Sequence, residues 1–169
     1  LVSGLVLICP FLRGSGSRGR DALMRAGMGL ALLRPWGPAL WRRYSASLWP
    51  GLPGAGARAA RLTALLRRPG RWRAFRATTR TDHRVVDPWF ETLACPALVV
   101  MGEEDPDWKD PAAEAAWVAA AVGRSAEPAP ILMVPGAGHA PMLEHSGAGG
   151  PRIVDFARSA SAPADDNRG

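Results

Sequence analysis

The sequence holds few of the residues that bind metals or form structural disulfides. It has two cysteines, Cys9 and Cys95, and three histidines, and no Cys-x-x-Cys pair or zinc-site spacing occurs among them. No glycine-rich loop ends in Gly-Lys-Ser or Gly-Lys-Thr, so a phosphate-binding loop of that class is excluded. Both cysteines lie in apolar, strand-like runs, which favours buried free thiols in a reducing compartment and a cytoplasmic protein. We therefore expect no metal and no other cofactor.

Long apolar runs are also missing. No stretch reaches eighteen apolar residues, so we expect no membrane-spanning segment and no stable membrane insertion. The apolar residues 1–12 carry neither a basic leader nor a small-residue cleavage site, which argues against a signal peptide. The hydrophobic fraction of 47% still provides for a core in 169 residues. Because the sequence opens at Leu1 inside a strand-like run, we expect it to be the back portion of something longer.

Lysine is nearly absent, and positive charge is unevenly spread. Residues 1–84 hold sixteen arginines against two aspartates, a formal charge of +14, whereas residues 85–169 carry −8. A basic half is typical of proteins that bind nucleic acid, anionic lipid or an acidic partner. Abundant Arg, Ala, Gly and Pro are also what GC-rich coding produces. Since no recognised nucleic-acid-binding motif accompanies the arginines, we expect no nucleic-acid partner.

Apolar runs and helix signals together predict an α/β fold. Continuous apolar runs are typical of parallel strands covered on both faces, and they occur at residues 2–10, 97–101 and 131–134. Capping residues and helical periodicity predict helices at 22–33 (capped by Asp21), 57–68, 71–79, 111–122 (capped by Asp110) and 151–160. The strand–helix–strand–helix order after residue 96 requires parallel pairing with crossover helices.

The same pattern predicts how the chain is divided. Residues 1–12 and 85–160 form a core with three parallel strands, and residues 13–84 form a helical insertion without a convincing strand. The polar residues 161–169 are expected to be a disordered tail. Four tryptophans fall in the insertion, where they would either line an apolar substrate pocket or pack between helices: Trp36, Trp41, Trp49 and Trp72.

Two residues with catalytic potential follow consecutive predicted strands. Asp105 comes after the strand 97–101, and His139 comes after the strand 131–134, in a turn with Gly136 and Gly138. Parallel neighbours end at the same edge of a sheet, so the two side chains are expected to meet there. A carboxylate on the Nδ1–H of an imidazole fixes its tautomer and stabilises the imidazolium, which is how a general base is prepared. Asp107 is an alternative acid, placed further from the strand end.

Other chemistry-bearing residues receive weaker interpretations. Ser17 lies in Ser15-Gly16-Ser17-Arg18-Gly19, which imitates a nucleophile turn but has Ser where the first Gly belongs and is separated from the preceding strand. A loop that enters the helical insertion is the plainer interpretation. His83 and His145 are assigned no role.

In the two segments that carry Asp105 and His139, the chain resembles the α/β-hydrolase family. The residues 96–106 (PALVVMGEEDP) resemble the family's penultimate strand with its acid, and 134–139 (VPGAGH) resemble its last strand with its histidine. The family order is nucleophile, acid, histidine, and the last two are matched. The opening LVLICP resembles the strand after the nucleophile elbow, and residues 13–84 would correspond to the helical cap. The departure is that no Gly-x-Ser-x-Gly occurs anywhere in the sequence.

The resemblance implies the C-terminal part of a hydrolase that acts on an ester or related bond of a small apolar substrate. His139 would be the general base and Asp105 its orienting acid. A missing serine would imply ester or amide hydrolysis, and a missing aspartate would imply epoxide or carbon–halogen hydrolysis. Without either, we expect the chain to be inactive and to self-associate through the unpaired edge of its first strand. The alternatives are a non-catalytic module that binds through the basic helical block, or a degenerate relic without function.

Overall fold

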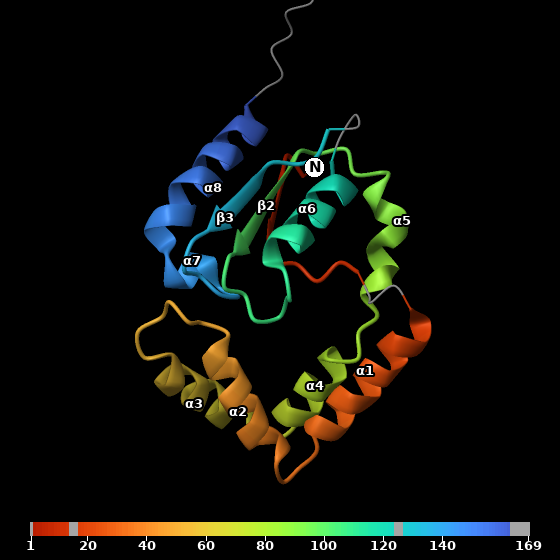
Figure 1. The fold of residues 1–169 in the computed structure, drawn as a ribbon, viewed down its shortest axis with the longest axis vertical. Helices are drawn as coiled ribbons and strands as arrows, with labels where there is room; N and C mark the ends of the chain where they lie inside the picture. The colour runs from red at the N-terminus through yellow and green to blue at the C-terminus, as the bar shows by residue number, and fades with distance from the viewer. Residues whose placement is uncertain (1, 14–16, 124–126, 163–169) are drawn as a thin grey trace, which may run out of the picture. The chain divides into compact units, whose positions relative to one another are not determined.

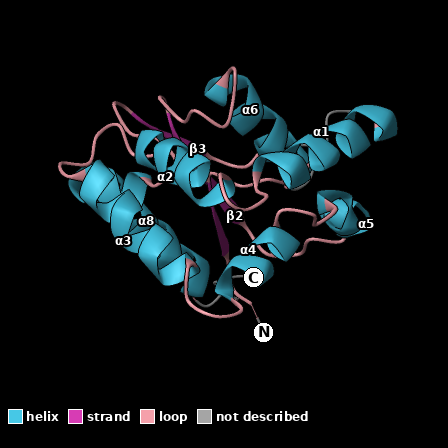
Figure 2. Ribbon diagram, turned by 90° about the horizontal axis from the view of Figure 1, so that it is seen from below, coloured by secondary structure: helices cyan, strands magenta, loops and turns pink. Residues whose placement is uncertain are grey.

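A computed structural model of the protein describes residues 2–13, 17–123 and 127–162 (Figure 1). It divides into two compact units, one of residues 1–10 and 89–169 and the other of residues 11–88. The first unit contains a parallel sheet of three strands in the order β1 (Leu5–Ile8), β2 (Ala97–Gly102), β3 (Ile131–Val134). The α/β class with three parallel strands, predicted from the sequence, is confirmed. Figure 2 shows the strands in magenta among a majority of helices.

Both faces of the sheet are covered, which explains why β2 is continuously apolar. Every residue of β2 is buried. Leu98 and Val100 point to one face, where they form a core cluster with Ile153 and Phe156 of α8 (Ser146–Ser161). The opposite face of β2 packs against α6 (Pro111–Ala121). Because side chains alternate along a strand, an apolar residue is needed at every position of β2.

Helix α6 begins at its capping residue, whereas α8 begins without a capping side chain. Asp110 accepts a hydrogen bond from the N–H of Ala113 at 2.9 Å, and Pro111 occupies the first turn of α6. The short α7 (Pro141–Glu144) precedes α8, which runs through Pro151 rather than beginning there. The predicted start of the last helix at 151 is therefore wrong by five residues. Ser161 also belongs to α8, so the predicted tail begins too early, and residues 163–169 lie outside the described residues.

The second unit is helical. It contains α1 (Arg18–Ala31), α2 (Gly37–Ser47), α3 (Ala55–Leu66), α4 (Arg71–Thr78) and the 3₁₀ turn His83–Val86, while α5 (Asp87–Phe90) lies at the boundary between the units. Three of its aromatic rings pack together: the ring centroids of Trp41 and Phe75 are 4.5 Å apart, and those of Trp72 and Phe75 are 5.4 Å apart. The indole N–H of Trp72 donates to the carbonyl of Leu32 at 3.1 Å.

The first helix differs from its prediction in its cap and in its start, which is Arg18 rather than residue 22. Ser17, not Asp21, is its N-cap, and the hydroxyl of Ser17 accepts from the N–H of Arg20. Asp21 is buried, with a carboxylate oxygen 3.8 Å from the Arg84 guanidinium. Two leucines at helical spacing in α1 face solvent, since Leu23 is 73% exposed and Leu30 is 64% exposed.

The first strand is shorter than residues 2–10, because its pairing with β2 covers only Leu5 to Ile8. Cys9 follows at a φ of 43°, a left-handed conformation that side chains rarely adopt, and this ends the strand. Among the described residues, none of the helices has the length and apolar character needed to cross a membrane.

Candidate active site

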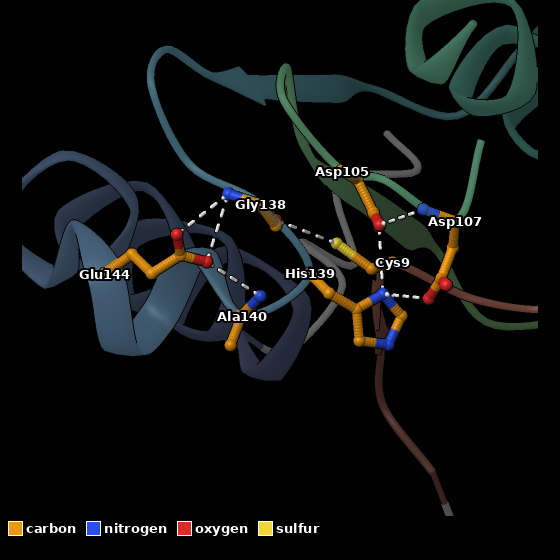
Figure 3. A network of polar contacts seen from close by, with 7 residues as sticks. All are labelled: Cys9, Asp105, Asp107, Gly138, His139, Ala140 and Glu144. Carbon is orange, nitrogen blue, oxygen red and sulfur yellow. Dashed lines mark hydrogen bonds and ion pairs between the residues drawn. The ribbon is translucent and has the colours of Figure 1, made fainter. Parts of the chain in front are cut away.

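Three neighbouring strands deliver the polar cluster shown in Figure 3. Cys9 follows β1, Asp105 follows β2 and His139 follows β3, so the three side chains meet at the carboxyl edge of the sheet. All residues of this cluster belong to the unit of residues 1–10 and 89–169. The turn after β3 can approach β2 closely because Gly102 has no side chain: a Cβ there would overlap the carbonyl oxygens of Ala137 and Gly138.

The two residues singled out in the sequence lie in direct contact. The Nδ1 atom of His139 is 2.9 Å from Oδ2 of Asp105. The other oxygen of Asp105 accepts the backbone N–H of Asp107 at 3.0 Å, so the carboxylate is held on both sides. The Asp105 side chain is fully buried, whereas 28% of the His139 side chain is exposed. A buried carboxylate on Nδ1 and a partly exposed imidazole form the geometry of an oriented base.

Asp107, the alternative acid, also reaches the imidazole. Its Oδ2 lies 3.1 Å from Nδ1 of His139, and its side chain is more exposed than that of Asp105. Burial raises the pKa of Asp107, and the charge of His139 partly opposes this rise. The structure therefore brings both aspartates to the same nitrogen, with Asp105 at the shorter distance and in the more buried position.

The surroundings of His139 favour its protonated form. Burial alone would lower the pKa of His139, but the hydrogen bond and the charge of Asp105 act in the opposite direction, together with the charges of Asp107 and Glu144. The net result is a pKa above the ordinary value for histidine. The negative charges thus outweigh desolvation at this imidazole.

Cys9 is the member of the cluster that the sequence did not indicate. Its sulfur, a carboxylate oxygen of Asp105 and an imidazole nitrogen of His139 lie within 4.8 Å of one another. Burial raises the pKa of the Cys9 thiol to about 12, and the S–H points to the carbonyl of Gly138 at 3.9 Å. Zinc is bound by thiolate, not by thiol, and the oxygens of Asp105 already accept hydrogen bonds. The groups therefore fit a hydrogen-bonded network better than a metal centre.

Comparison with known proteins decides the family. The model of the alpha/beta hydrolase family matches residues 1–148. The chain belongs to the alpha/beta hydrolase family. A search of the curated proteins by sequence finds no match.

Solved structures show the same fold at low sequence identity. An esterase from Thermogutta terrifontis is similar over 95% of this chain, with a TM-score of 0.65 and 19% identity. A 2-hydroxy-6-oxo-6-phenylhexa-2,4-dienoate hydrolase from Rhodococcus sp. strain RHA1 is similar over 90%, with a TM-score of 0.62 and 16% identity. MenH from S. aureus is similar over 95%, with a TM-score of 0.63 and 17% identity. This hydrolase-family chain spans 57%, 54% and 60% of their respective lengths, which is little more than half.

Three other residues considered in the sequence, Ser17, His83 and His145, make hydrogen bonds to the backbone. Ser17 acts as the N-cap of α1 in the helical unit, while Ser15 and Gly16 of the imitation motif lie outside the described residues. The Nδ1 of His83 is 2.7 Å from the carbonyl oxygen of Phe11, also in the helical unit. His145 donates from Nε2 to the carbonyl of Gly136 at 3.2 Å, and so it contacts the turn that carries His139.

Proposed function

We propose that this chain is the C-terminal part of an α/β-fold hydrolase, with His139 as the general base and Asp105 as the acid that orients it. The observation that carries the proposal is the 2.9 Å contact between Nδ1 of His139 and Oδ2 of Asp105 at adjacent strand ends. Because Nδ1 is held by the carboxylate, proton transfer to a reactant would run through Nε2. In the complete enzyme, His139 would take a proton from a nucleophile or water and return it to the leaving group.

The substrate class follows from the reaction that this pair can serve. A base and an orienting acid support hydrolysis of an ester or related bond, and the esterase among the similar structures is consistent with this. We propose a small, apolar molecule as the substrate. We further propose that the helical unit of residues 11–88 is the cap of that enzyme. A cytoplasmic location also remains part of the proposal, supported by the free thiols of Cys9 and Cys95.

The nucleophile is the part that these 169 residues do not supply. No Gly-x-Ser-x-Gly occurs in the sequence, and the chain spans little more than half of its structural relatives. We propose that another polypeptide segment carries it, together with the backbone donors of the oxyanion hole. Since one such donor alone is worth about 3–4 kcal/mol in the transition state, a chain without the nucleophile and the donors is expected to be inactive.

The test is hydrolysis of p-nitrophenyl acetate by the chain alone and by a fusion to the nucleophile-bearing front portion of an esterase of this fold. The chain alone should match its His139→Ala variant. The fusion should turn over, and His139→Ala should slow it by about 10²–10⁴-fold. Equal turnover by the fusion and its His139→Ala variant would remove His139 from the mechanism. Enzymatic turnover by the chain alone would refute the missing nucleophile.

The edge of the sheet suggests how a missing strand, or a second copy, would attach. Leu5 donates its N–H to the carbonyl of Pro96, just before β2, and Cys9 donates to the carbonyl of Val100 in β2. Alternation therefore directs the N–H and C=O groups of Val6 and Ile8 away from β2. In the part of the chain that the structure describes, no strand pairs with this edge. An apolar edge of this kind recruits another strand. We propose that the isolated chain self-associates there.

A second candidate function, binding of an anionic partner, is favoured by one feature of the helical unit. Residues 11–88 hold sixteen arginines against three aspartates. A depression of about 800 Å³ in this unit is lined by Leu33, Trp72 and five arginines. The arginines are Arg34, Arg67, Arg68, Arg73 and Arg76. Retention on heparin that falls steeply with salt would support this function. A double replacement, Arg67→Ala with Arg73→Ala, should weaken retention more than Arg152→Ala with Arg158→Ala on α8; equal effects would assign retention to overall charge.

A further inference from the structure

The turn that presents His139 is held by a carboxylate from the helix that follows it. Both carboxylate oxygens of Glu144 lie 3.0 Å from the backbone nitrogen of Gly138, and Oε1 also accepts the N–H of Ala140 at 3.1 Å. Figure 3 shows the Glu144 side chain reaching back from α7 to the residues on either side of His139. The backbone of His139 is thus fixed on both sides by one side chain.

The position of Glu144 explains why a carboxylate is suited to holding the turn. Glu144 is the last residue of α7, a helix of four residues whose N-cap, Ala140, has no side-chain hydrogen bond to offer. The N–H groups of Gly138 and Ala140 precede the helix, and their acceptor is the Glu144 side chain rather than a backbone carbonyl of the helix. A carboxylate can accept both N–H groups at once, and charged acceptors form the stronger hydrogen bonds. A shorter or neutral side chain would lose part of the hydrogen bonding to these two N–H groups.

The anchored turn is also the one that must hold His139 against Asp105. Gly136, at a φ of 69°, and Gly138 make the turn compact but give it little intrinsic rigidity. His145 adds a hydrogen bond from Nε2 to Gly136 at the start of the turn. Glu144 accepts the N–H groups of both residues next to His139. The carbonyl oxygens of the same two residues accept from the thiol of Cys9 and from the N–H groups of Leu143 and Glu144. Loss of the Glu144 carboxylate should therefore change the position of the imidazole more than that of the strand.

We propose that Glu144 is a positioning residue for His139, which keeps Nδ1 of the imidazole in contact with Asp105 by fixing the backbone on both sides of it. The inference rests on the proposed role of His139 as the base, and it assigns to Glu144 no contact with a substrate. The titratable groups that face His139 are Asp105 and Asp107 from the segment after β2, Cys9 from the end of β1, and Glu144 itself from α7.

Two variants separate positioning from simple charge. Glu144→Gln removes the negative charge but keeps one carbonyl oxygen that can accept a hydrogen bond. Glu144→Ala removes the charge and the hydrogen-bond acceptors. Glu104→Gln is the matched control, because Glu104 is exposed and lies next to Asp105 in the sequence. The measurement is NMR on the full chain: the pH titration of the His139 ring, assigned with His139→Gln, and the hydrogen-bonded Nδ1–H resonance. A folded sheet is checked in each variant by the amide signals of β2 and β3.

Positioning predicts a graded result. Glu144→Ala should lose the Nδ1–H resonance and lower the pKa of His139 further than Glu144→Gln, while Glu104→Gln should retain the resonance. If the resonance persists in Glu144→Ala, or if both Glu144 variants shift the pKa equally, the proposal is overturned and Glu144 acts by charge alone. These signals do not depend on turnover. An inactive fusion would therefore count against the proposed function and leave this result unaffected.

Discussion

Gly102 is the position at which one added methyl group should do most damage to the candidate site. It is the last residue of β2 and pairs with Val134 of β3. A Cβ at Gly102 would overlap the carbonyl oxygens of Ala137 and Gly138, which are backbone atoms of the turn that carries His139. β2 cannot move away, because it is buried on both faces and lies between β1 and β3 in the sheet. The variant Gly102→Ala must therefore push the turn outward.

The size of the effect follows from what the methyl group meets. Overpacking a core typically costs about 1–3 kcal/mol, and backbone on the opposing side places this variant at the upper end, about 3 kcal/mol. For a chain of this length each kcal/mol lowers the melting temperature by about 2–4 °C, so a fall of roughly 6–12 °C is expected. The displaced turn should also draw His139 away from Asp105, which would lower the pKa of His139.

Thermal unfolding followed by circular dichroism measures the stability, and an NMR titration measures the pKa of His139. Gly150→Ala in α8 is the control, because a Cβ there meets nothing within 4 Å. In a helix, alanine is favoured over glycine by about 1 kcal/mol, so this control should melt at the same temperature or higher. If Gly102→Ala melts within roughly 2 °C of the unchanged chain, less than 1 kcal/mol is involved and the close approach does not constrain the turn.

Three further predictions concern the same unit. Because the pKa of His139 is raised in the folded state, the stability that its protonation contributes is fully present below about pH 6.5 and is lost as pH rises through the folded pKa. Denaturant unfolding across this range should show the loss, and His139→Gln should remove it. With a pKa of about 12, the fraction of Cys9 present as thiolate at pH 8 is on the order of 10⁻⁴. Iodoacetamide should therefore label the half-buried Cys95 first, and equal labelling of the two cysteines in the folded chain would contradict the burial of Cys9. Val6→Pro removes an outward N–H from β1 without touching the ladder to β2, so light scattering should show less self-association, and unchanged association would place the contact elsewhere.

The elements with local signals could be predicted closely from the sequence. The strand at Ile131–Val134 coincides with its prediction, and α6 begins at Pro111 because Asp110 is its cap and ends before Gly123. The contact between Asp105 and His139 could also be anticipated, since it needs only two facts: each residue follows a strand, and the strands are parallel neighbours. Such information is carried by short stretches of sequence and one topological rule.

What the sequence could not reveal depends on conformations and tertiary contacts without a local signature. Cys9 joins the cluster through a left-handed backbone that cysteine does not favour, so no residue preference indicates it. Glu144 holds the histidine turn only because α7 is four residues long, which brings its last side chain within reach of Gly138. Asp21 is a buried residue inside α1 rather than its cap, and its contact with Arg84 joins residues more than sixty positions apart, which no local pattern indicates.

The charges around His139 have opposite effects on the stability of the folded chain and on the fraction of His139 that is neutral. Asp105, Asp107 and Glu144 raise the pKa of the imidazole, and so they stabilise the folded chain while His139 is protonated. A general base must be neutral before it accepts a proton, so the same charges reduce the fraction of active base at neutral pH and increase its strength once deprotonated. The complete network lies within one unit and within this chain. In the proposed hydrolase, the protonation state of His139 would therefore be set by these residues before any nucleophile is added. A segment that supplies the nucleophile would meet an imidazole that Asp105 already orients.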